Sequence, residues 1–281
     1  MKKIMTIVAL GAMMLGVASC GDDSPVREDK LSFGVTDMMS KTVTGDNFFD
    51  YAGSKLRFDL NYLADTACLQ VLGTKFAVRQ PVTVNLMFDA MKVTYTARDQ
   101  FVLTGTSYNV MDGYQVKDIR CSTNLSLKMY SLRYTVVSER ATSQVYVYPT
   151  SILSALADEN LDYANANEPY FIFKCGLNSD GNYAGNLLLN NVQFQLGESS
   201  SPKMTIRIPY DEHVTIAGTA TGYTVTGTGI TGLYQQGTVE IPFERSTIDD
   251  LMIDVDIVHK SYSIYFKCMG GEYENSGRLY L

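Results

Sequence analysis

The amino-acid sequence predicts an all-β fold made of two tandem antiparallel β domains, each a β-barrel or a β-sandwich. From Leu31 onward, most of the chain alternates apolar with polar residues. This period of two is typical of strands that cover a core with one face. Segments of the first half also recur in the second half in the same order. Only one short stretch has helical spacing.

The chain begins with a segment laid out like a secretory signal. Lys2 and Lys3 precede an uncharged apolar run, residues 4–17, which is shorter than the roughly 20 residues of a membrane-spanning helix. The run ends in Val17-Ala18-Ser19-Cys20, which resembles a bacterial lipobox. The resemblance implies that residues 1–19 are removed and that Cys20 carries a lipid that anchors the protein. A cysteine that merely ends a signal peptide is the alternative.

Residues 20–30 are polar and charged, and are interrupted by Pro25, so we expect a flexible tether. Asp22 and Asp23 directly after the cysteine resemble the export signal of Bacteroidetes surface lipoproteins. The resemblance implies a lipid-anchored protein of the bacterial outer membrane, exposed at the cell surface. A solvated linker explains the same acids equally well, so the periplasmic side remains open.

The charge of the chain argues against nucleic acid as a partner. The net charge is −7, and removal of residues 1–19 takes away two lysines and no acid, which leaves −9. A clearly acidic protein repels phosphate backbones. The remaining length suits one large domain or two ordinary ones.

Four stretches carry the clearest strand pattern. Each places its apolar residues on one face and its polar residues on the other, as in an antiparallel strand with one buried face. The stretches are 56–62, 82–88, 204–208 and 251–257. Residues 151–157 follow Thr150, a plausible N-cap, and space Ile152, Leu153 and Leu156 as on a helix face, so a short helix is predicted there.

An internal repeat divides the chain. Residues 101–108 match 223–230, and residues 131–135 match 261–265. Val82-Thr83-Val84 matches Met204-Thr205-Ile206, and Lys75-Phe76 matches Gln193-Phe194. We therefore predict domain 1 at 31–140, a connector with the short helix at 141–167, and domain 2 at 168–281. Together with the lipobox and tether, this layout resembles the calycin-like β-barrel lipoproteins of Bacteroidetes, a family without an assigned chemistry.

Four cysteines remain after Cys20, and an even number in an exported protein allows disulfides. Cys175 lies on the apolar face of the first strand of domain 2, and Cys268 lies on that of a strand near its end. Because first and last strands are neighbours in a closed barrel, we hypothesise a Cys175–Cys268 disulfide. Two buried free thiols are the alternative. Cys68 and Cys121 form a weaker candidate pair, since Cys68 is out of phase with Leu69 and Val71.

One modification site is a candidate. Asp65-Thr66-Ala67 resembles the short O-glycan acceptor pattern of exported Bacteroidetes proteins, which makes Thr66 a candidate for O-glycosylation.

The sequence contains few motifs that are typical of catalytic or metal-binding sites. Gly227-Thr228-Gly229-Ile230-Thr231-Gly232 spells GxGxxG, but a strand-like run follows it where a dinucleotide site requires a helix. The two histidines, His213 and His259, lack zinc-site spacing. Asp249, Asp250, Asp254 and Asp256 fit a solvated strand face. We expect no enzyme activity, no metal and no cofactor.

A non-catalytic binding role is the expected function. The predicted partners are a membrane, reached through the N-terminal lipid, and a glycan, a small apolar ligand or another surface protein. A barrel lumen lined with Tyr, Phe and Met would favour the small apolar ligand, whereas a filled lumen with an exposed aromatic patch would favour a glycan or a protein. A fimbrial or adhesion subunit is the alternative, and a hydrolase without a recognisable motif is the third reading.

Overall fold

The structure, a computed structural model, describes residues 30–61, 64–97, 100–111, 113–125, 129–149, 151–155, 169–196, 198–244 and 246–280. These residues form 21 β-strands and no α-helix, so the predicted all-β class is confirmed. None of them belongs to a helix that is long and apolar enough to cross a membrane.

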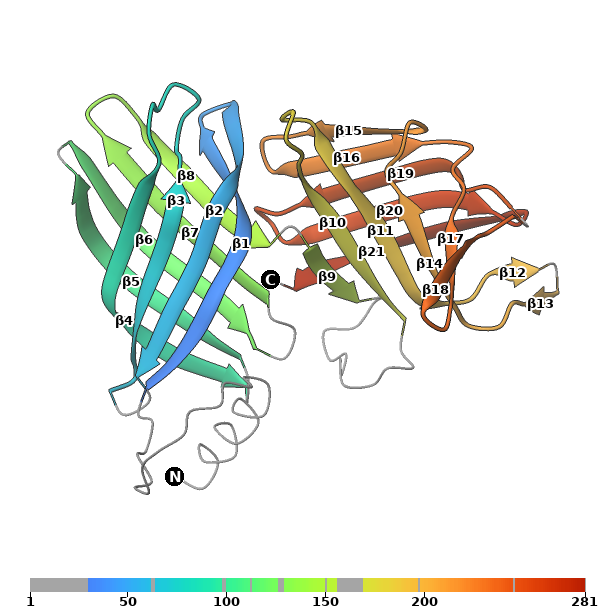
Figure 1. The fold of residues 1–281 in the computed structure, drawn as a ribbon, viewed down its shortest axis with the longest axis horizontal. Coiled ribbons are helices and arrows are strands. Elements are labelled where there is room, and N and C mark those ends of the chain that lie inside the picture. The colour runs from blue at the N-terminus through green and yellow to red at the C-terminus, as the bar shows by residue number, and fades with distance from the viewer. Residues whose placement is uncertain are drawn as a thin grey trace, which may run out of the picture.

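The first eight strands close into an antiparallel barrel in chain order (Figure 1). The barrel closes where β1 pairs with β8, from Met38 opposite Pro149 to Val43 opposite Gln144. Its strands are β1 (Lys30–Thr44), β2 (Asn47–Asn61), β3 (Thr66–Thr74), β4 (Val84–Ala97), β5 (Gln100–Met111), β6 (Tyr114–Asn124), β7 (Met129–Ser138) and β8 (Thr142–Pro149).

The period-two pattern explains the interior of the barrel. Leu56, Phe58 and Leu60 on β2 are each 1 % exposed, while the polar residues between them face outward or sit half-buried. Phe88, Leu103 and other apolar side chains of the barrel strands complete one core. An eight-stranded barrel is just wide enough for its inward side chains to fill it, so this interior is packed.

The described residues from Ser151 onward form an 11-stranded antiparallel sheet in the order β15-β16-β19-β20-β21-β9-β10-β11-β14-β17-β18, with one separate hairpin. A small hairpin, β12 (Gln195–Leu196) with β13 (Ser199–Ser200), projects from it (Figure 1). The sheet strands are β9 (Ser151–Ala155), β10 (Tyr170–Leu177), β11 (Tyr183–Val192), β14 (Met204–Pro209), β15 (Val214–Gly218), β16 (Gly222–Gly227), β17 (Leu233–Gln236), β18 (Val239–Pro242), β19 (Asp249–Asp256), β20 (Ser261–Cys268) and β21 (Gly271–Tyr280).

The predicted short helix at 151–157 is wrong in its described part, because residues 151–155 form strand β9. Ile152 lies opposite Phe173 and Leu153 opposite Ile172, so the segment adds an antiparallel strand to β10. Backbone pairing with a neighbouring strand outweighs a helical spacing that extends over only two turns. Strand β8 also lies in the range assigned to the connector, and it is the strand that closes the barrel.

A contact region that we call the seam joins the barrel to the second sheet. Met39 on β1 and Tyr148 on β8 point out of the barrel, yet they are only 1 % and 2 % exposed. Both pack into the core of the second sheet, which we call the second core. This part of the seam is therefore an apolar contact, in which two outward side chains of the barrel complete the second core.

Candidate functional site

A cavity of about 400 Å³ lies at one end of the second core, and we call it the aromatic pocket. Ligand sites in proteins typically span about 300–1,000 Å³, so the volume suits a small molecule. Strands β10, β11, β20 and β21 supply most of the wall. The lining residues are Pro169, Phe171, Leu189, Asn191, Val192, Gln193, Phe194, Lys203, Ile264, Phe266, Tyr273, Glu274 and Asn275.

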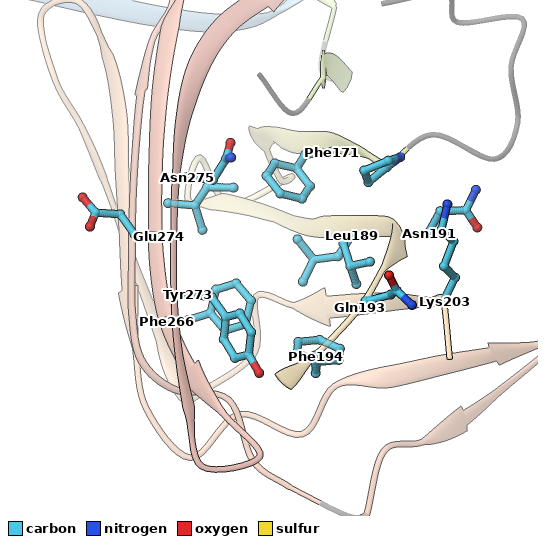
Figure 2. A pocket seen from close by; sticks show the side chains of 13 residues that line it. Phe171, Leu189, Asn191, Gln193, Phe194, Lys203, Phe266, Tyr273, Glu274 and Asn275 are labelled. Atoms are coloured by element: carbon cyan, nitrogen blue, oxygen red, sulfur yellow. The ribbon is translucent and has the colours of Figure 1, made fainter. Parts of the chain in front are cut away.

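Four aromatic rings dominate the wall of the aromatic pocket (Figure 2). The rings of Phe266 and Tyr273 stack with centroids 5.2 Å apart and planes 24° apart. Phe194 meets the Tyr273 ring edge-on at 5.2 Å, and Phe171 lies nearer the start of β10. Offset and edge-on pairs are the favoured arrangements of aromatic rings, so they hold the wall in one geometry.

A break in strand β11 brings Phe194 into the pocket. Asn191 has a positive φ of 52°, and the pairing of β11 with β14 shifts register between Leu189 and Val192. Such bulges redirect the chain and the side chains after them. The buried Ser201 then fixes the segment, because its hydroxyl accepts the N–H of Phe194 at 2.9 Å and its N–H donates to the Phe194 carbonyl at 2.8 Å.

Polar groups gather at the rim of the aromatic pocket. Gln193 and Lys203 are exposed, so the cavity reaches the surface. Asn275 accepts a hydrogen bond from the Tyr262 hydroxyl at 2.6 Å. Glu274 points to the opposite side of β21, away from the rings (Figure 2). An apolar wall with a few polar groups at the mouth can hold an apolar or amphipathic molecule and orient its polar end.

A buried ion pair lies at the seam. The ammonium of Lys41 on β1 is 2.8 and 3.0 Å from the two carboxylate oxygens of Asp50 on β2. It also donates to the Thr219 carbonyl at 2.8 Å and lies 4.2 Å from the centre of the Phe48 ring. The Tyr183 hydroxyl on β11 donates to the same carboxylate. Burial lowers the pKa of Lys41, and Asp50 opposes that shift.

The Cys175–Cys268 disulfide is not formed, because both cysteines are buried free thiols. Strands β9 and β21 lie between β10, which carries Cys175, and β20, which carries Cys268. The premise that these strands are neighbours fails because β21, the true last strand, pairs with β20 and β9 inserts between β21 and β10. Burial raises the pKa of Cys175 to about 12, so it stays a neutral thiol at physiological pH.

Cys68 and Cys121 are free thiols as well, and they cannot meet through the barrel wall. Cys121 is fully buried inside the barrel. Cys68 faces outward on β3, where its thiol donates to Asp89 at 3.1 Å. Burial, with the Asp89 contact, raises the pKa of Cys68 to about 11.

Of the two predicted modification sites, only Thr66 lies within the described residues. The signal segment 1–19 and the lipidation site Cys20 lie outside the described residues. Thr66 is the first residue of β3, half-buried beside Asp65, which has a positive φ of 49°. Its candidate O-glycosylation remains a prediction.

The histidines occupy exposed turns. His213 joins Asp211 and Glu212 in a group whose ligand atoms lie within 4.8 Å of one another. Asp211 already accepts the backbone N–H of His213 at 2.9 Å, and a structural zinc site requires four ligands. His259 bonds Asp256 through its backbone N–H and its ring, both at 2.8 Å. This geometry is that of capped turns.

The glycine-rich segment 227–232 and the aspartates near it form a local network. Strand β16 ends at Gly227, and β17 follows with no helix between them in the described chain. Asp249 accepts the N–H of Gly229 at 2.8 Å and the hydroxyl of Thr247 at 2.7 Å. These bonds lower the pKa of Asp249, so the carboxylate stabilises the turn.

Sequence reasoning assigned no role to Phe194, Tyr273 or Asn191. The repeat contained one signal, since Phe194 aligns with Phe76, whose ring packs against the barrel core. A comparison of the chain with protein-family models, curated proteins and solved structures finds no match. The geometry of the aromatic pocket is therefore the basis for assigning a function.

Proposed function

We propose that this chain is a non-catalytic binding protein whose aromatic pocket takes a small apolar or amphipathic ligand. The observation that carries the proposal is the cavity of about 400 Å³ walled by Phe171, Phe194, Phe266 and Tyr273. Aromatic and aliphatic walls stabilise apolar ligands at about 25 cal/mol per Å² of apolar surface removed from water.

The barrel supports this proposal by contrast. Its interior holds Phe58, Phe88 and Tyr134, each no more than 1 % exposed, as expected of an eight-stranded barrel that its own side chains fill. If the two parts are copies of one β unit, the packed barrel would have a structural role. The second sheet, which keeps an open pocket, would bind the ligand.

We propose further that the second sheet derives from the same β unit as the barrel. The matched residues 101–108 and 131–135 lie on β5 and β7, with β6 between them. Their counterparts begin in β16 and β20, with β19 between them. Equal spacing of matched segments in the two sheets supports a common origin.

The N-terminal pattern completes the proposal. A lipid on Cys20, followed by the acidic tether, would hold the two β units at the bacterial outer membrane, where they present the aromatic pocket at the cell surface. The two free edges of the second sheet, β15 and β18, are five and four residues long. Short edges are poor templates for strand addition, which weighs against a fimbrial subunit that polymerises through donated strands.

Binding of the neutral fluorescent probe N-phenyl-1-naphthylamine tests the proposal. The half-buried Val192 lines the pocket, so Val192→Trp should fill it and reduce probe affinity at least tenfold. Val239→Trp on the exposed strand β18 is the matched control and should bind like the wild type. The chain contains no tryptophan, so the emission of each new indole reports its environment.

The expected result is a blue-shifted indole in Val192→Trp, with lost probe binding, and a solvent-exposed indole in Val239→Trp with binding retained. Undiminished probe binding in a Val192→Trp protein whose indole is blue-shifted would place the probe elsewhere and overturn the proposal.

A further inference from the structure

A second, smaller cavity lies at the seam, and we call it the basic pocket. Its volume is about 140 Å³, below the range of sites that enclose a whole small molecule. The barrel contributes Arg120, Arg133 and Tyr146, and the turn between β19 and β20 contributes Val258 and Lys260. Three cations thus line one small cavity in a chain of net charge −7.

The two arginines are direct cross-strand partners. Arg120 on β6 lies opposite Arg133 on β7. Side chains at such positions have Cβ atoms about 4.5–5.5 Å apart, and like charges placed there are destabilising. Arg133 is in turn the partner of Tyr146 on β8. The barrel therefore presents two adjacent guanidinium groups and a phenol toward the second sheet.

Lys260 adds a third positive charge to this pair. All three residues are exposed, yet the surrounding wall removes part of Lys260 from water, which lowers its pKa, and the charges of Arg120 and Arg133 lower it further. The described residues that line the basic pocket include no aspartate or glutamate. Asp256, the acid nearest to Lys260 in the chain, already bonds His259 through both carboxylate oxygens.

Within the described chain, neither arginine nor Lys260 forms an ion pair. We propose that the basic pocket binds a tetrahedral oxyanion, the phosphate or sulfate group of a ligand, between Arg120, Arg133 and Lys260.

The chemistry of the lining favours this class of ligand. A guanidinium offers two parallel N–H donors that match the oxygens of phosphate and sulfate, and an ammonium adds a point charge. Ser122 and Ser131, cross-strand partners that also line the cavity, add hydroxyl donors. The small volume accepts the charged group alone, so the remainder of the ligand would extend into solvent.

Thermal unfolding of the purified chain with added inorganic phosphate, at constant ionic strength in chloride, tests the site. Phosphate should raise the Tm of the wild type. Arg133→Gln relieves the repulsion with Arg120, so its Tm without phosphate should equal or exceed that of the wild type. Its phosphate affinity should be about tenfold or more weaker, because one charge-assisted bonding partner is lost.

Lys92→Gln is the matched control. Lys92 is an exposed lysine on β4, in the same register row as Arg120 but separated from it by Thr104 on the strand between them. It lies outside the basic pocket. It should keep the full response to phosphate, whereas Lys260→Gln should lose it as Arg133→Gln does. Equal phosphate responses in the wild type, Arg133→Gln and Lys260→Gln, or no response in the wild type, would overturn the proposal.

Two further probes identify the source of the anion. Calorimetric titration with glucose 6-phosphate tests a soluble ester, and co-sedimentation with phosphatidic acid vesicles, against phosphatidylcholine vesicles, tests a lipid headgroup. If the wild type binds glucose 6-phosphate or phosphatidic acid vesicles and Arg133→Gln abolishes that binding, the result supports the site and identifies the source of the anion. Binding that Arg133→Gln leaves intact in both arms contradicts it.

Discussion

Asp50→Asn is expected to destabilise the chain by about 3–5 kcal/mol, the usual cost of removing one partner of a buried ion pair. The side chains of Lys41 and Asp50 are 1 % and 5 % exposed, so water cannot replace the lost carboxylate. The Lys41 ammonium would keep the Thr219 carbonyl, the face of the Phe48 ring and the amide oxygen of the new asparagine, and none of these carries the negative charge that balances it.

An independent bound gives the same magnitude. Lys41 can escape an unpaired buried charge by losing its proton, and its ordinary pKa is 10.5. Deprotonation at pH 7 then costs about 5 kcal/mol, at about 1.4 kcal/mol per pH unit. The destabilisation therefore cannot greatly exceed this value, because the neutral amine is always available.

The same reasoning predicts the pH dependence. In the variant, the pKa of folded Lys41 falls further below that of the unfolded chain, so the unfolded chain binds more protons between the two values. Stability then rises with pH across that window, by up to about 1.4 kcal/mol per unit. The deficit relative to the wild type should shrink as the pH rises from 7 toward 10.5.

Urea unfolding at neutral and at mildly alkaline pH measures both effects. The double variant Lys41→Met with Asp50→Asn removes the stranded charge and should recover most of the lost stability. A double variant as unstable as Asp50→Asn alone, or a deficit that is constant with pH, would refute an unpaired Lys41 as the cause.

Three other outcomes are expected. Tyr183→Phe should cost about 1–3 kcal/mol in urea unfolding, since Asp50 loses a buried donor; no change would mean that water replaces the hydroxyl. Ser201→Ala should cost a similar amount and weaken N-phenyl-1-naphthylamine binding, because it frees Phe194 from its clamp. Iodoacetamide should label Cys68, slowly, before the three buried cysteines described in the structure, as mass spectrometry of peptides would show. Equal labelling of Cys175 in the folded chain would contradict its burial.

The strands were predictable because alternate residues of each strand are buried, and the buried positions require apolar side chains. The apolar residues at 251, 253, 255 and 257 are each no more than 3 % exposed, and those between them face outward or sit half-buried. A shift of one residue would move this whole set to the solvent face, so sequence and register are tightly linked. The strands at 56–60 and 204–208 follow the same logic.

Non-local pairing explains the failures. Residues 151–155 take their conformation from β10, whose partner residues begin at Tyr170. The cysteine pairing failed for the same reason, since it depended on which strands are neighbours in the second sheet. The aromatic pocket was hidden because Phe194 reaches it only through the bulge at Asn191, and a bulge breaks the periodicity that sequence reasoning follows.

One register row around the barrel connects the buried ion pair with the basic pocket. Across strands β6, β7, β8, β1 and β2, the cross-strand partners are Arg120, Arg133, Tyr146, Lys41 and Asp50. At the Asp50 end of this row, the second sheet supplies Tyr183 and the Thr219 carbonyl, which satisfy the charges. At the Arg120 end it supplies Lys260, which adds to them. A seam that served only to hold the barrel against the second sheet would not place a third cation, Lys260, beside two arginines, because the three charges repel one another. An anion bound between them would replace this repulsion with attraction across the seam.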